Sequence, residues 1–131
     1  AYQYKLMFED RYITLWVYTI ETVLAEKIET VLSRSITNTR LRDFYDLYIL
    51  QKTEKPIDRN SFAAALAATC RKRNSEKVLS GYVQALNIIE ESPVMRELWE
   101  SYQKKNSYAA GIEWIEVMNA VRSLCDSCIG Q

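Results

Sequence analysis

The chain has 131 residues, of which 48% are hydrophobic and 26% charged, as is typical of one globular domain with a real core. Its 17 basic and 17 acidic residues cancel, so no global field draws it to nucleic acid or to a membrane surface. No apolar stretch reaches the roughly 18 residues that a membrane-spanning helix needs, and the N-terminus does not resemble a secretory signal. These features predict a soluble cytoplasmic protein.

The cysteine and glycine content limits the kinds of catalytic, metal and phosphate-binding site that the sequence can form. The three cysteines, Cys70, Cys125 and Cys128, are an odd number without any histidine, which argues against a disulfide framework and excludes Ser-His and Cys-His catalytic pairs. The pair Cys125 and Cys128 lacks further soft ligands for zinc, so we expect it to pack in a helix. The three glycines are isolated, and a glycine-rich phosphate loop is therefore absent from the sequence.

Residues 2–18 differ from the rest of the chain. They are rich in aromatic and β-branched side chains on both sides of the polar segment Glu9-Asp10-Arg11, which predicts a short β-hairpin. An isolated hairpin is marginally stable in water, so it either packs on the helices or forms the edge of a larger sheet. The first residue is Ala1 rather than Met, as expected for a domain excised from a longer protein; processing or a cloning remnant would explain it equally.

After Tyr18 the pattern is helical to the end, and the predicted fold is mainly α, a hairpin followed by a bundle of about six helices. Thr19 caps the first helix, Asn38 or Thr39 the second, and Ser92 precedes a proline at the start of the fifth. In the last helix we expect Ile115 in the core and Trp114 at its margin. The predicted ranges are 20–34, 40–51, 58–73, 75–91, 93–105 and 107–128.

In the first helix, Lys27 falls inside the stripe that should be apolar. The stripe has a helical period and contains Ile20, Val23, Leu24, Ile28, Val31 and Leu32. Arg34 lies at the edge of the same stripe, seven residues after Lys27. A lysine at such a position must reach solvent, pair with an anion or line a cleft.

The second helix is apolar around most of its circumference, yet Arg42, Asp43 and Asp46 share one sector of it. Buried carboxylates need partners, and Lys27 and Arg34 are close in sequence. One interpretation is an internal salt-bridge network that ties the two helices together. The other is a polyanion site, in which Lys27 and an arginine meet phosphates while an aspartate holds the cations or a metal. Periodicity favours the network but excludes neither.

Two other groups of residues have structural interpretations. The cluster Arg71-Lys72-Arg73 closes the third predicted helix, where cations satisfy the helix dipole, and this is favoured over contact with nucleic acid. The aromatic residues Trp99, Tyr102 and Tyr108 could stack on bases, but their helical spacing favours a place in the core and at its rim.

The segments ETVLAEKIETVLSR (residues 21–34) and NTRLRDFYDLYIL (residues 38–50) resemble the C-terminal half of the AbiEii/AbiGii nucleotidyltransferase-like toxins of bacterial abortive-infection, or phage-defence, and type IV toxin–antitoxin systems. The resemblance covers residues 2–52 and is most specific in AEK (25–27) and RDFYD (42–46). It implies that residues 1–18 are the terminal strands of a nucleotidyltransferase core and residues 19–131 a helical C-terminal domain.

The resemblance also implies roles for single residues. Lys27 and Arg34 would correspond to the family's third motif, with the lysine meeting the nucleotide phosphates. Arg42, Asp43 and Asp46 would correspond to the fourth, with Arg42 on the nucleotide and one of the aspartates as the essential carboxylate. The Gly-Ser and Asp-x-Asp motifs that hold the family's catalytic metal have no counterpart in the sequence.

Two hypotheses follow. In the first, the complete protein transfers a nucleoside monophosphate from an NTP, with Mg²⁺, to an acceptor such as tRNA, while this chain alone is inactive and binds neither metal nor cofactor. In the second, the chain is a non-catalytic helical module that binds a protein partner such as an antitoxin. The resemblance favours the first, and its implied NTP site gives the misplaced charges a function.

Overall fold

The computed structural model describes residues 19–52 and 57–129, which form seven α-helices and two short 3₁₀ helices without any strand. The predicted mainly helical fold is confirmed for these residues. The predicted hairpin lies outside them, and the division of the chain at residue 18 stays a prediction. None of the described helices is long and apolar enough to cross a bilayer.

The first three helices begin close to where their capping residues predicted. Helix α2 spans Ile20–Arg34, α3 spans Leu41–Lys52 and α4 spans Arg59–Arg73. The Thr19 hydroxyl accepts a hydrogen bond from Thr22 N–H, and Asp58 accepts one from Asn60 N–H, which satisfies free donors at the starts of α2 and α4. Before α3, the Asn38 side chain accepts from Arg40 N–H.

The later helices are α5 (Lys77–Ser80), α6 (Tyr82–Glu91), α7 (Pro93–Lys105) and α8 (Trp114–Cys128). Two predictions were wrong here. The helix expected over 75–91 is divided at Gly81, a residue with poor helix propensity. The last helix begins at Trp114 rather than Ser107, because Glu113 and Glu116 form a capping box there and residues 107–109 form a 3₁₀ turn.

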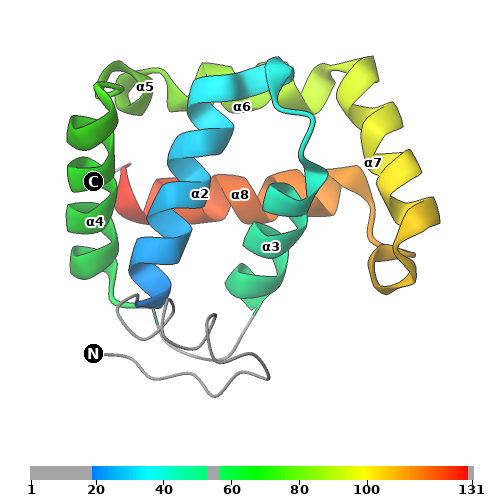
Figure 1. The fold of residues 1–131 in the computed structure, drawn as a ribbon, viewed down its shortest axis with the longest axis horizontal. Helices are drawn as coiled ribbons and strands as arrows, with labels where there is room; N and C mark the ends of the chain where they lie inside the picture. Colours follow the sequence, from blue (N-terminus) through cyan, green and yellow to red (C-terminus); the bar gives the residue numbers. More distant parts are fainter. Residues whose placement is uncertain (1–18, 53–56, 130–131) are drawn as a thin grey trace.

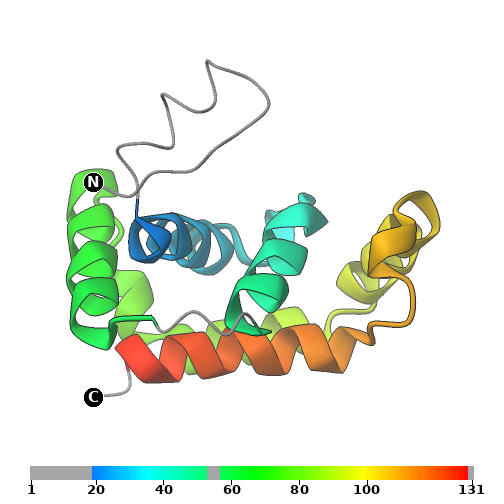
Figure 2. The ribbon, with the colours of Figure 1, turned by 90° about the horizontal axis from the view of Figure 1, so that it is seen from below.

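The helices place α2 and α3 beside each other in the middle of the molecule, with α4 and α7 at opposite ends (Figure 1). Helix α2 packs mainly against α4, and α3 packs mainly against α8. Seen from below, α8 runs along one side of the molecule, and α2 and α3 lie together on its inner side (Figure 2). The two segments that carry the charges inconsistent with periodicity are therefore neighbours.

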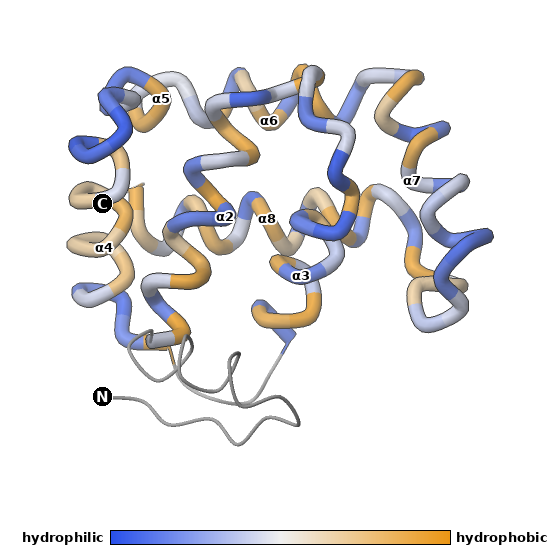
Figure 3. The backbone as a smooth tube through the Cα atoms, in the orientation of Figure 1, coloured by the Kyte–Doolittle hydropathy of each residue, from blue (hydrophilic) through white to orange (hydrophobic). Residues whose placement is uncertain are grey.

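One hydrophobic core joins the helices, and its largest members include Phe44, Phe62 and Trp99. Hydrophilic residues gather at the C-terminal end of α4, whereas α6 and α8 alternate hydrophobic and polar segments (Figure 3). In α8 the expected positions were reversed, since Trp114 is buried and Ile115 is exposed. The helix begins at Trp114 itself, so its indole can reach back over α6 and α7.

Candidate functional site

Lys27 lies between the two aspartates of α3. Its Nζ is 2.9 Å from Asp46 Oδ2 and 3.4 Å from Asp43 Oδ1, and it donates a hydrogen bond to the latter. Arg42 Nε lies 3.8 Å from Asp46 Oδ2, at the i,i+4 spacing seen in the sequence. The structure thus brings four of the five predicted site residues into one ionic network between α2 and α3.

Burial differs across this network. The Asp43 side chain is 7% exposed, that of Lys27 23% and that of Arg42 69%. A carboxylate as buried as Asp43 needs a cation or several donors, and the described residue that supplies its hydrogen bond is Lys27. Arg42 adds little, because an exposed ion pair is screened by water.

A polar hollow of about 590 Å³ opens beside Lys27 and Asp43. Arg34 lines it, as its predicted position beside Lys27 implied, whereas Arg42 and Asp46 do not belong to its lining among the described residues. Four cations and three carboxylates share the lining, which consists of Val23, Glu26, Lys27, Glu29, Thr30, Ser33, Arg34, Arg40, Asp43 and Arg73.

Glu29 and Arg73 form a second ion pair at this hollow, between α2 and the end of α4. Glu29 Oε2 also accepts hydrogen bonds from Ser33 Oγ at 2.6 Å and from Ser75 Oγ at 2.8 Å. Burial acts to raise the pKa of Glu29, but the hydrogen bonds from Ser33, Arg73 and Ser75 outweigh it and leave that pKa below the ordinary glutamate value. Glu29 therefore stays ionised at neutral pH.

Sequence reasoning missed Glu29, Arg40 and Arg73. Glu29 borders the apolar stripe of α2, four residues after the buried Ala25, and that spacing was the available signal. Its pairing with Arg73 joins residues 44 positions apart and depends on how α2 packs on α4. Arg73 was interpreted as a helix-ending cation, a role that it also fills.

Arg34 and Arg40 make no ion pair with any residue in 19–52 or 57–129. Arg40 is nevertheless fixed at its backbone, because its N–H donates to Asn38 Oδ1 at 3.0 Å. Asn38 is fully buried, and its Nδ2 has no hydrogen-bond partner within the described part of the chain.

The donors at this site do not fit a magnesium ion. Mg²⁺ requires oxygen ligands arranged around a vacant centre, but the facing oxygens of Asp43 and Asp46 are already directed at the Lys27 ammonium. Among residues 19–52 and 57–129, no group of three His, Cys, Asp or Glu side chains could hold a metal ion. The network therefore holds the Lys27 ammonium in position, and its carboxylates are not free to bind a metal ion.

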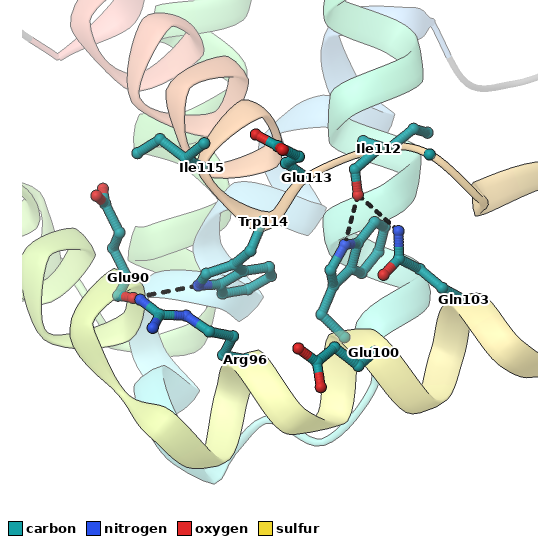
Figure 4. Close-up of a pocket in the computed structure, with 10 residues that line it drawn as sticks. Glu90, Arg96, Glu100, Gln103, Ile112, Glu113, Trp114 and Ile115 are labelled. Carbon is teal, nitrogen blue, oxygen red and sulfur yellow. Dashed lines mark hydrogen bonds between the residues drawn. The ribbon is translucent and has the colours of Figure 1, made fainter.

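A second hollow, of about 530 Å³, lies where α6, α7 and the start of α8 meet (Figure 4). Its lining holds three carboxylates and one cation together with the indoles of Trp99 and Trp114. Trp114 Nε1 donates to Glu90 O at 3.2 Å, and Trp99 Nε1 donates to Ile112 O at 2.9 Å. This acidic and aromatic surface would repel a phosphate.

The other residues singled out by sequence take structural positions. The three cysteines are free thiols in the core, as expected, and burial raises the pKa of Cys125 and raises that of Cys128 to about 12. Such thiols remain protonated and unreactive at neutral pH. Tyr102 stacks on Trp99 with ring centroids 5.5 Å apart, and its hydroxyl meets that of Tyr108 at 2.8 Å. The prediction of core and rim aromatics is confirmed.

Comparison with known proteins agrees with the resemblance seen in the two helical segments. The family model described as nucleotidyl transferase AbiEii toxin, type IV TA system, matches residues 2–118, which is most of the chain. No curated protein matches the chain, and no solved structure does. The match includes Lys27, Asp43 and Asp46, both ion-paired networks and the polar hollow. The chain belongs to the AbiEii family of nucleotidyltransferase toxins from type IV toxin–antitoxin systems.

Proposed function

We propose that this chain forms the nucleotide-facing wall of a nucleotidyltransferase that moves a nucleoside monophosphate from an NTP to an acceptor such as tRNA. Lys27, Arg34 and Arg42 are the proposed nucleotide-binding cations, and Asp43 and Asp46 the essential carboxylates. The printed sequence contains no Gly-Ser or Asp-x-Asp motif, so the metal-holding residues are proposed to lie outside these 131 residues.

The single observation that supports this most strongly is the place of Lys27. Its ammonium is held by two aspartates of α3 and also lines a hollow in which cations outnumber carboxylates. A network that served only to join α2 and α3 would gain nothing from opening onto Arg34 and Arg40, which have no carboxylate partner in the described part of the chain. A pre-positioned cation at such an opening is what stabilisation of phosphate charge requires.

The proposed reaction is an in-line displacement at phosphorus. The acceptor hydroxyl attacks the α-phosphorus, the bond from that phosphorus to the bridging oxygen breaks, and pyrophosphate leaves with the electron pair while the acceptor loses its proton. Negative charge therefore develops on the leaving phosphates. Lys27, held in one position by Asp43 and Asp46, would offset this charge without reorganising, which is where a fixed cation is most effective.

Two variants of the complete native protein test this function. We expect Lys27→Ala and Asp46→Ala to abolish growth inhibition in cells that express the toxin, while both variants stay folded. The melting temperature should fall by a few degrees in Asp46→Ala, where Lys27 keeps Asp43 as its partner, and further in Lys27→Ala, which leaves the buried Asp43 carboxylate without its cation. Arg122→Ala is the control, because it removes an ion pair of similar burial, to Glu90, away from the hollow.

Toxicity that persists in either variant, or a fold that collapses in both, would contradict the proposal and favour a purely structural network. The Arg122→Ala control separates these outcomes from a general effect of losing a salt bridge. If it were equally inactive, the assay would be reporting stability rather than the site.

The alternative is a non-catalytic helical module that binds a protein partner. The absence of the metal-holding motifs favours it, and exposed apolar side chains such as Val83 and Ile88 on α6 offer a surface. The open reading frame discriminates the two functions. If neither the frame nor a separate subunit supplies a Gly-Ser and Asp-x-Asp segment, the enzymatic proposal fails and the module remains.

A further inference from the structure

The aromatic hollow, where α6, α7 and the start of α8 meet, has no role in the proposed function. Its lining residues on α7 follow the i, i+3, i+4, i+7 pattern of a single helix face: Arg96, Trp99, Glu100 and Gln103. The start of α8 contributes Glu113 and Trp114. The enclosed space of about 530 Å³ is of the size that proteins use to hold small ligands or a partner's side chain.

The hydrogen-bond donors of this lining are largely used inside the chain. Trp99 Nε1 donates to Ile112 O at 2.9 Å, and the Gln103 amide nitrogen donates to the same oxygen at 2.7 Å (Figure 4). Trp114 Nε1 donates to Glu90 O at 3.2 Å. The amide oxygen of Gln103, by contrast, accepts no hydrogen bond from a described residue. The hollow therefore offers a ligand mainly acceptors, and a ligand that fits must bring donors.

The carboxylates of the lining are not balanced by the one cation among them. Glu90 pairs at 2.6 Å with Arg122, which does not line the hollow. Glu100 and Glu113 make no ion pair with any residue in 19–52 or 57–129. Neither does Arg96, although it stands four positions before Glu100 on α7. Negative charge is left over at the hollow, and a cation is the ligand that complements it.

We propose that the aromatic hollow binds an arginine side chain of a basic partner protein. The carboxylates of Glu100 and Glu113 accept hydrogen bonds from the guanidinium, and Gln103 Oε1 is a further acceptor. This inference is independent of the proposed function, because none of these residues belongs to the ionic network between α2 and α3. It gives a binding role to the end of the molecule opposite α4 (Figure 1).

The floor and the acceptors of the hollow favour a guanidinium over an ammonium. Trp99 is 1% exposed and Trp114 6%, so the indoles form a dry floor instead of open faces for stacking. A guanidinium is less strongly hydrated than an ammonium, and it therefore loses less free energy on entering such a space. Its planar fork also carries five N–H donors, which can serve several separate acceptors at once.

The rim of the hollow favours a polypeptide as the source of this cation. Ile115 lines the hollow and is 43% exposed. A free cation would leave this aliphatic side chain in water, whereas the residues that flank an arginine in a polypeptide can cover it. Arginine and tryptophan are also enriched among the residues that dominate the free energy of protein–protein binding.

The test is a nuclear magnetic resonance titration of the 131-residue chain with acetyl-Leu-Arg-Leu-amide, in which the guanidinium is the sole charge. We expect the Trp114 indole N–H resonance to shift to saturation at millimolar peptide, and the affinity to fall as salt is added. Glu100→Gln should weaken binding by about fivefold. Arg96→Gln should strengthen it by a similar factor, because it removes a competing cation. The matched control is Glu97→Gln, an exposed carboxylate of α7 outside the lining, which should change the affinity by less than about twofold.

The same peptide with citrulline in place of arginine keeps the shape without the charge, and we expect it not to bind. Equal binding of the citrulline peptide would overturn the inference, as would indole resonances of the wild type that do not move. Weaker binding in Arg96→Gln, or equal weakening in Glu97→Gln, would overturn it too. Methylguanidine tests the source of the cation, since an affinity equal to that of the peptide would replace the protein partner by a small molecule. Indole spectra of the free variants that match the wild type show that each variant is folded.

Discussion

The ionic hollow beside Lys27 and the aromatic hollow beside Trp114 are close in size and differ in chemistry. The one between α2, α3 and α4 has ionic groups in its walls, some of them buried, such as Glu29 and Asp43. The one at α7 and α8 is built on buried indoles, with carboxylates at its edge (Figure 4). Their volumes do not distinguish the two hollows, but the ionic hollow contains buried charges, and burying a charge costs free energy.

This difference supports the ionic hollow as the proposed site. Both indole N–H groups of the aromatic hollow donate to backbone carbonyls, and its one cation, Arg96, lies among three carboxylates. In the ionic hollow, by contrast, Arg34 and Arg40 have no carboxylate partner in the described part of the chain. The lining of the ionic hollow holds more cations than carboxylates, whereas that of the aromatic hollow holds more carboxylates than cations, so the first suits an anion better than the second.

The largest effect should come from the aromatic hollow. Trp99 is 1% exposed and stacks on Tyr102, so Trp99→Ala should lower the free energy of unfolding by about 3–5 kcal/mol through cavity formation. Urea denaturation followed by circular dichroism measures this. Trp99→Phe keeps most of the volume and should cost clearly less, and equal losses would mean that packing does not account for the effect.

Glu29→Ala should have the next largest effect, about 2 kcal/mol, because it leaves Ser33, Ser75 and Arg73 without their shared acceptor. The same denaturation experiment applies. Glu26, which also lines the hollow but is not buried and has no ion pair among the described residues, provides the control. A Glu26→Ala loss as large as that of Glu29→Ala would refute the buried network as a source of stability.

The stability contributed by Glu29 should depend on acid pH. The folded-state pKa of this carboxyl lies below its ordinary value, so the folded state binds its proton less tightly than the unfolded chain does. The contribution is therefore fully present above the ordinary glutamate range and is lost as the pH falls through the folded-state pKa. Denaturation of wild type and Glu29→Gln across pH 3–7 should give curves that converge at the acid end. Parallel curves would exclude the linkage.

A smaller effect is expected at Tyr82, far from both hollows. Its hydroxyl donates to Asp126 Oδ1 at 2.7 Å, and this bond, with some desolvation, raises the pKa of Tyr82 to about 12. The contribution is present below the unfolded tyrosine pKa near 10 and is lost as the pH rises toward the folded value. Tyr82→Phe should cost about half a kcal/mol at neutral pH. Ultraviolet titration measures the pKa of Tyr82, and an ordinary tyrosine value would contradict the hydrogen bond to Asp126.

The smallest effect should come from charge removal in the aromatic hollow. Glu100→Gln should leave the free energy of unfolding within error, because Glu100 has no ion pair among the described residues. Thermal unfolding of the variant and of wild type measures this. A marked fall in melting temperature would instead indicate that the Glu100 carboxylate contributes to the packing of the aromatic hollow.

Local signals in the sequence predicted the starts of α2 and α7, because a capping residue and its target N–H lie within three residues of each other. They failed at Gly81, where a residue of poor helix propensity divides the helical pattern, and at the start of α8, where a 3₁₀ turn and a capping box replace its first turns. The periodicity that placed most core residues also misassigned Ile115, since the true helix start changed its surroundings.

The ionic network was predictable in part from helical periodicity. Lys27, Asp43 and Asp46 were visible as charges at positions where helical period demands apolar residues, and the structure places them within ion-pair distance. Arg73 could not be assigned, because its contact with Glu29 spans 44 residues and arises only when α2 packs on α4. Long-range pairing of this kind needs the fold.

The most direct test of the central claim is the double variant Lys27→Met/Asp43→Leu in the complete native protein. Both replacements keep the outline of the side chain they replace, and together they remove the buried Asp43 charge with the cation that pairs with it. Asp46, whose side chain is a quarter exposed, keeps Arg42 Nε at 3.8 Å. We expect a melting temperature close to that of wild type together with complete loss of toxicity. Retained toxicity at retained stability would show that the charges of α2 and α3 serve the fold alone.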